Sequence, residues 1–109
     1  MNARTLVPPD MDERLDEHAA MLPAGSRQAL LGYLRFGLRP GHFLTAVLSN
    51  DLFEACARAD DDNKRALCDY VFFLYNYAPA EALGSPENVR EWIQYGAELR
   101  EQHRVEVGR

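Results

Sequence analysis

The feature that most constrains the fold is a run from residue 66 to residue 78, ALCDYVFFLYNYA, which Pro79 closes. Between Tyr70 and Tyr75 a helix built from this run is apolar or aromatic on every side. Such a helix must be covered on more than one side. We therefore expect it to form the central helix of the protein. Its main core stripe is predicted to consist of Leu67, Tyr70, Val71, Leu74 and Ala78.

The remaining aromatic side chains of this run need a second surface to cover them. They are Phe72, Phe73, Tyr75 and Tyr77. Either the flanking helices wrap the run completely, or a second copy of the chain supplies the missing cover, as in isologous dimers. Aromatic residues are enriched at interface cores as well as in domain cores. We favour the second alternative, which predicts a homo-oligomer with these residues at its interface.

The other segments between the proline and glycine breaks also carry the helical period rather than strict alternation. The predicted helices occupy residues 10–22, 23–37, 40–49, 52–59, 66–78 and 86–101, with Gly37 left-handed at the end of the second. This pattern predicts an all-α fold, a small compact bundle of about five to six short helices. Trp92 is expected to pack on the helix of residues 66–78.

The length of 109 residues favours one domain, 1–109, with a single core. Within it we expect an acidic N-terminal helix extension (1–22), a core (23–101) and a frayed tail (102–109). The extension carries a run of carboxylates at Asp12, Glu13, Asp16 and Glu17. They are interpreted as helix-stabilising charges on a solvated face, with an acidic contact face as the alternative.

A formal net charge of −5 argues against general nucleic-acid binding, since that binding depends on neutralising phosphates. No apolar run approaches the roughly 20 residues that span a bilayer, and the start lacks the apolar region of a secretory signal. We expect no membrane association and a cytoplasmic location. Cys56 and Cys68 lie in apolar surroundings, which predicts buried, reduced thiols, with Phe53 and Cys56 facing inward.

No constellation of catalytic residues is recognisable. His18, His42 and His103 fall in unrelated segments, so no pairing with a nucleophile is indicated. No residues have the spacing of a metal site, and the glycines match no phosphate-binding loop. We therefore expect a protein that is not an enzyme and that holds neither a metal nor a cofactor.

One constellation favours the binding of an anion. Arg35 and Arg39 flank a helix break, and the next helix opens at Gly41 and His42 with free backbone N–H groups. An aromatic ring from Tyr33 or Phe43 would suit a stacked nucleotide base. The predicted ligand site consists of Tyr33, Arg35, Arg39, Gly41 and His42. In the alternative interpretation, both arginines are solvated cations that satisfy the last carbonyls of the preceding helix.

Several short stretches carry a resemblance to known proteins. They are PGHFLTAVLSNDL (40–52), ARAD (57–60), FLYN (73–76) and GSPE (84–87). In these stretches the chain, from Leu22 to about Trp92, resembles a family of short proteins encoded by bacteriophages and prophages. Small phage proteins outside the virion genes are often inhibitors or adaptors that bind stoichiometrically, so the resemblance implies a binding function. It implies no particular site residues.

The first hypothesis is a non-enzymatic, oligomeric binding module of phage or prophage type that inhibits or sequesters a component of host machinery or of a host defence pathway. Its target would be a host protein or a small nucleotide signal. The alternative is a small DNA-associated regulator or adaptor of phage origin, since short helices joined by tight turns are similar to helix-turn-helix modules. Residues 40–49 and 52–59 carry almost no basic side chains, which disfavours this alternative.

Overall fold

The computed structural model describes residues 5–107, and every element of regular structure in that range is helical. The all-α prediction is therefore confirmed. In chain order the elements are α1 (Pro9–Ala19), α2 (Ala24–Phe36), α3 (His42–Leu48), α4 (Leu52–Arg58), α5 (Asp61–Arg65), α6 (Leu67–Tyr77), the 3-10 helix η1 (Ala80–Ala82) and α7 (Pro86–Val107). The break before residue 66 holds a short helix, α5, which the sequence did not predict; the Asp60 carboxylate caps it by accepting from the Asn63 N–H (2.8 Å).

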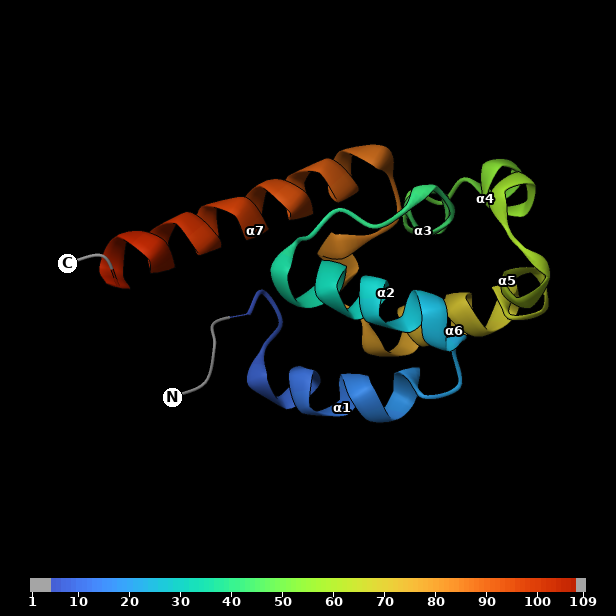
Figure 1. Ribbon diagram of the computed structural model, residues 1–109, viewed down its shortest axis with the longest axis horizontal. Helices are drawn as coiled ribbons and strands as arrows, with labels where there is room; N and C mark the ends of the chain where they lie inside the picture. The colour runs from blue at the N-terminus through green and yellow to red at the C-terminus, as the bar shows by residue number, and fades with distance from the viewer. Residues whose placement is uncertain (1–4, 108–109) are drawn as a thin grey trace.

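Helix α2 lies at the centre of the molecule, between α1 and α7 (Figure 1). Its inward side chains are all buried: Leu30, Leu31, Tyr33 and Leu34. The prediction that residues 66–78 form the central helix is wrong. Helix α6 packs against α1 and α5, and one side of it faces solvent.

Trp92 packs on α2, not on α6 as the sequence predicts. Its indole N–H donates to the carbonyl oxygens of Tyr33 (3.0 Å) and Leu34 (3.2 Å). Buried indole N–H groups need such partners, and the last carbonyls of a helix need donors. The contact satisfies both requirements and joins α7 to α2.

The remaining carbonyls at the end of α2 are satisfied by other segments. The Leu6 N–H donates to the Arg35 carbonyl (2.7 Å), and the Arg100 guanidinium donates to the Phe36 carbonyl. The chain then leaves through Gly37 at φ 68°, which confirms its predicted left-handed conformation. The alternative role of Arg35 and Arg39 holds only in part: Arg39 is exposed, as expected of a solvated cation, but neither side chain donates to these carbonyls within the described residues.

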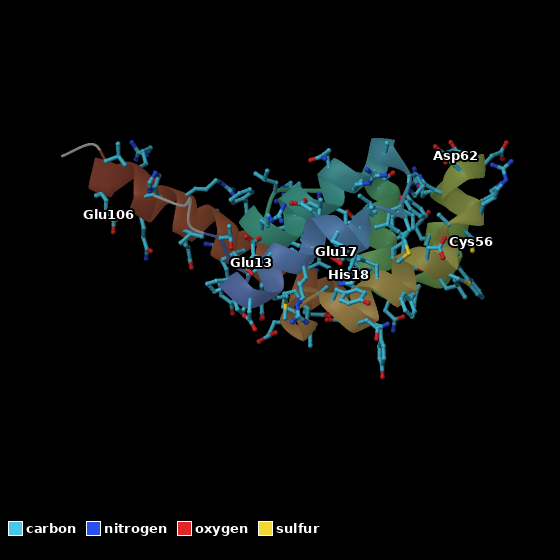
Figure 2. The ribbon with its side chains drawn as sticks, turned by 90° about the horizontal axis from the view of Figure 1, so that it is seen from below. Glu13, Glu17, His18, Cys56, Asp62 and Glu106 are labelled. Carbon is cyan, nitrogen blue, oxygen red and sulfur yellow. The ribbon has the colours of Figure 1, made fainter. Side chains whose placement is uncertain are left out.

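Helix α1 is part of the core, not an extension of it. Leu15 and Ala19 are fully buried. The His18 ring stacks on Tyr77 of α6, with centroids 3.7 Å apart and planes 5° from parallel. Figure 2 shows Glu13 and Glu17 along α1 beside His18, and both acids are exposed, as expected of a solvated face. Pro9 begins this helix, so Asp10 lies in its first turn instead of capping it.

The inward face of α4 differs from the prediction. Its buried side chain is Ala55, and Ala59 follows at its end, whereas Phe53 is 87% exposed. The expectation of buried thiols is also wrong, because both Cys56 and Cys68 are exposed. Ala55 lies beside Val47 of α3, and α3 and α4 pack closely, so the small side chain is turned inward and the larger ones outward.

Helix α7 starts as predicted, since the Ser85 hydroxyl accepts from the Asn88 N–H (3.1 Å) and Pro86 occupies the first turn. The predicted fraying after residue 101 is not seen in the described residues, where the helix continues to Val107. Its last turns extend beyond the bundle (Figure 1) and are fully solvated. They give the molecule its 47 Å long axis.

Candidate functional site

Large apolar side chains are exposed on α4 and on α6, two helices that meet at a small groove lined by Leu52, Ala55, Leu67 and Val71. Five large apolar residues on these helices are each more than half exposed, and we call them the α4–α6 face: Leu52, Phe53, Val71, Phe72 and Tyr75. Helix α4 and the start of α6 lie at the end of the molecule remote from the tip of α7 (Figure 1). Exposed apolar patches of this kind mark interaction sites on soluble proteins.

The exposed part of α6 follows helical spacing. Residues 68, 71, 72 and 75 recur at three- and four-residue intervals, so they share one side of the helix. Tyr70, Phe73 and Leu74 occupy the other side and are buried. Val71 was predicted in the core stripe, and the structure places it outside with 54% exposure. A helix that is apolar all round offers no sequence signal for which side turns inward.

A small groove of about 60 Å³ lies between the two helices. Leu52 and Val71, which belong to the α4–α6 face, form its sides. Its other lining residues include Val47, Ala55 and Leu67. The Asp51 carboxylate at its rim accepts from the Glu54 N–H (3.1 Å), so this acid caps α4.

The predicted oligomer interface is divided by the structure. Phe72 and Tyr75 are exposed and belong to the α4–α6 face, but Phe73 is fully buried and cannot contact a partner. Tyr77 is half-buried behind His18 and lies edge-on to Phe72, with centroids 6.4 Å apart. Tyr77 instead contacts α1 of the same chain through its stack on His18, because α1 packs on α6. Leu52 and Phe53 join the exposed aromatics instead.

The predicted anion site is also divided. The Tyr33 ring is fully buried, and its hydroxyl donates to the Ala82 carbonyl (2.6 Å), so it cannot stack on a ligand. Burial raises the pKa of this phenol well above its usual range. Phe43, the other predicted stacking ring, is 7% exposed and lies edge-on to Tyr70. Only Arg39, Gly41 and His42 come together, in one cleft.

The Arg35 side chain forms ion pairs with α1 and is not directed to the predicted anion site. Its Nε lies 2.6 Å from the Asp12 carboxylate, and its Nη1 lies 3.2 Å from that of Asp16. A further N–H donates to the Asp12 carbonyl (3.1 Å). Desolvation lowers the pKa of the guanidinium, but the hydrogen bonds and charges of Asp16 and Asp12 outweigh it, so the pKa is raised. Arg35 lies 23 and 19 residues from Asp12 and Asp16 in the chain, so these ion pairs could not be predicted from local spacing.

Two further properties concern the whole described range. Residues 5–107 contain no group of three histidine, cysteine or acidic residues placed to hold a metal ion. In the same range, no helix has both the length and the apolar character needed to cross a membrane. No family model matches the chain, and no curated protein or solved structure shows significant similarity to it.

Proposed function

We propose that this protein is a non-enzymatic binding module that acts by covering a surface of another protein molecule with its α4–α6 face. The observation that carries this proposal is the exposure of large apolar side chains on two adjoining helices, with Phe53 and Tyr75 at 87% and 85%. Removing apolar surface from water contributes roughly 25 cal/mol per Å². Covering this face would therefore favour association.

Phe72 and Tyr75 are the expected anchors of such a contact. They project from the same side of a helix whose opposite side is fixed in the core by Tyr70 and Phe73, which are fully buried. Aromatic side chains on rigid elements dominate the binding energy of many interfaces. The charges of Glu54 and Arg58 on α4 offset each other, because the two side chains pair (3.0 Å), and the remaining charge at the groove is that of the Asp51 carboxylate.

A second copy of the chain is one expected occupant, which would make the protein a homo-oligomer. In an isologous contact the same patch meets itself, so each copy would offer both protruding rings and the groove between Leu52 and Val71. The pairing of protruding and recessed apolar parts on one face supports this arrangement.

A host protein is the other occupant that fits a binding module. We propose that the chain is an inhibitor or sequestering protein that acts on host machinery or a host defence pathway, on the expectation that the stretches 40–52, 57–60, 73–76 and 84–87 are similar to those of short bacteriophage and prophage proteins. Because such a protein works by occupancy, its effect would scale with its molar amount and would need no turnover.

Sedimentation velocity of the purified chain tests the self-association. The double variant Phe72→Ser with Tyr75→Ser should keep the fold, because exposed side chains contribute little to stability. We expect the unaltered chain to form a discrete oligomer and the double variant to sediment as a monomer. Tyr95→Ser on α7 is the matched control, since Tyr95 is also an exposed aromatic residue (47%). An oligomer that persists in the double variant, or one that Tyr95→Ser disrupts equally, would contradict the role of the α4–α6 face.

A further inference from the structure

A separate cleft of about 410 Å³ lies between α3 and the first half of α7. Its polar lining consists of Arg39, His42, Thr45, Ser49 and Arg90. None of the residues of the α4–α6 face lines it. The volume lies within the range of about 300–1,000 Å³ that is typical of small-molecule sites.

The polar side chains of this cleft are largely free of internal partners. Among the described residues, no hydrogen bond or ion pair engages the side chains of Arg39, His42, Thr45 or Ser49. Arg90 lies 3.8 Å from Glu87, but both side chains are more than two-thirds exposed, so this pair is weak and exchangeable. The cleft therefore presents a set of hydrogen-bond donors with nothing inside the molecule to occupy them.

The charged residues that line the cleft are basic, whereas the chain as a whole has a net negative charge. Acidic residues outnumber basic ones by 17 to 12 in the sequence, yet none of the described lining residues carries a carboxylate. An adjoining hollow, which shares His42, Thr45 and Ser49, does contain Asp51 and Glu54. Those two acids are already engaged, by the Glu54 N–H and by Arg58. Glu87 lies 3.8 Å from Arg90 but does not line the cleft, so the charged groups of the lining itself are the two guanidinium groups of Arg39 and Arg90. Two such groups in one cleft favour an anion.

The other walls of the cleft are apolar. They are formed by Pro40, Pro86, Val89 and Ile93. Val89 and Ile93 lie one helical turn apart on α7, and Arg90 follows Val89 directly, so α7 presents both a cation and an apolar wall. A purely inorganic ion would leave this wall unused.

We propose that the cleft binds a small organic phosphate of about nucleoside monophosphate size. Arg39 and Arg90 hold the phosphate, because guanidinium groups match its oxygens in bidentate geometry. Thr45 and Ser49 donate hydroxyl hydrogen bonds, and the organic part lies against Val89 and Ile93. Tyr33 and Arg35 take no part. This ligand site is independent of the protein-binding face, so either can fail without the other.

Titration of the full chain, followed by ¹H–¹⁵N correlation spectra, tests this site with AMP, adenosine and inorganic phosphate as probes. We expect AMP to shift the amides of residues 39, 41–49 and 87–93, and to bind at least about tenfold more tightly than adenosine or inorganic phosphate. Arg39→Gln and Arg90→Gln should each weaken AMP binding by about tenfold or more. Arg39→Lys should retain part of the affinity for AMP, since lysine keeps the positive charge but lacks the bidentate hydrogen-bonding geometry of the guanidinium group.

Arg104→Gln is the matched control. Arg104 also lies on α7 and pairs with an acid three residues before it, as Arg90 does, but it does not line the cleft. Its substitution removes the same charge and should leave AMP affinity unchanged. The proposal is overturned if AMP shifts none of the cleft amides, or if Arg90→Gln and Arg104→Gln weaken binding equally. Equal affinity for AMP and inorganic phosphate would overturn the role of the apolar wall.

Discussion

Gly37 and Gly96 lie in direct backbone contact where α7 crosses the end of α2. A Cβ atom added to Gly96 would lie 2.6 Å from the Gly37 Cα, and one added to Gly37 would lie 2.7 Å from the Trp92 carbonyl oxygen. These approaches are to backbone atoms, which cannot move aside as flexible side chains do. The pair therefore fixes how closely α7 packs, and with it the position of Trp92 and of the cleft beside α3.

Gly96→Ala is expected to lower the free energy of unfolding by about 1–3 kcal/mol, because the added methyl group overpacks a backbone contact. Urea denaturation measures the change. Gly25→Ala is the control, since a Cβ there meets nothing within 4 Å and alanine favours a helix. Equal stability of the two variants would show that the helices do not cross at this point.

Stability should fall in alkaline solution. Burial raises the pKa of both Tyr33 and Tyr70. Above the ordinary tyrosine pKa of about 10, the unfolded chain releases these protons while the folded chain retains them, so the free energy of unfolding falls as pH rises. The contribution is fully present below that pH, and each tyrosine removes up to about 1.4 kcal/mol per pH unit above it.

Urea titrations at a series of pH values check this dependence. Tyr33→Phe should show a shallower loss above pH about 10, because one of the two phenols is gone. Tyr75→Phe, which alters an exposed phenol, should keep the slope of the unaltered chain. The account of the buried phenols fails if the slope is the same in all three proteins.

Arg35→Ala should destabilise the fold by about 1–3 kcal/mol, because it strips Asp12 and Asp16 of a partly buried partner. Arg65→Ala offers a comparison, since the pair of Arg65 with Asp62 is exposed on both sides and contributes little. Thermal or urea denaturation of both variants measures the difference. AMP binding should be unaffected by Arg35→Ala, because Arg35 does not line the cleft. A loss of AMP binding in the folded variant would show that Arg35 does take part in the ligand site.

Both thiols should react with a disulfide reagent such as DTNB while the protein is folded, because Cys56 and Cys68 are exposed. Cys56→Ser and Cys68→Ser separate the two rates. Reaction that required prior unfolding would contradict the orientation of α4 and α6. In the oligomer, Cys68 should be protected more than Cys56 if the contact centres on α6, since Cys68 shares its side with Val71, Phe72 and Tyr75.

The sequence predicted those helices that have clear ends or one clear apolar face. Gly37, and Ser85 with Pro86, marked a helix end and a helix start through local backbone chemistry, and both predictions are confirmed. The all-helical fold follows from the same periodicity. Such features depend on neighbours in the chain, so they are visible without knowledge of tertiary contacts.

The inward faces of α4 and α6 could not be predicted in this way. Helix α4 is too short for periodicity to decide between Phe53 and Ala55, and close packing on α3 favours the smaller residue. Helix α6 has apolar residues on every side, so contact with α1 decides which are buried. Gly96 did carry a signal, because a glycine inside a helical pattern costs about 1 kcal/mol and suggests close packing.

The cleft was only partly predictable. Arg39, Gly41 and His42 are close in sequence and were grouped correctly, but Arg90 joins them only through the crossing of α7 over α2. Arg35 and Tyr33 were grouped by the same proximity and lie elsewhere, since adjacent helical positions point in different directions. Contacts between helices distant in the sequence therefore determine which of these residues share a site.

Site-specific photocrosslinking tests the central claim most directly. A benzophenone amino acid would replace Tyr75 on the α4–α6 face or, as a control, Tyr95 on α7. We predict that position 75 gives a discrete crosslinked product, either a dimer of the purified chain or a single species in bacterial lysate, and that position 95 gives neither. Crosslinking at position 75 that is no stronger than at position 95 in both settings would contradict the α4–α6 face as the binding surface.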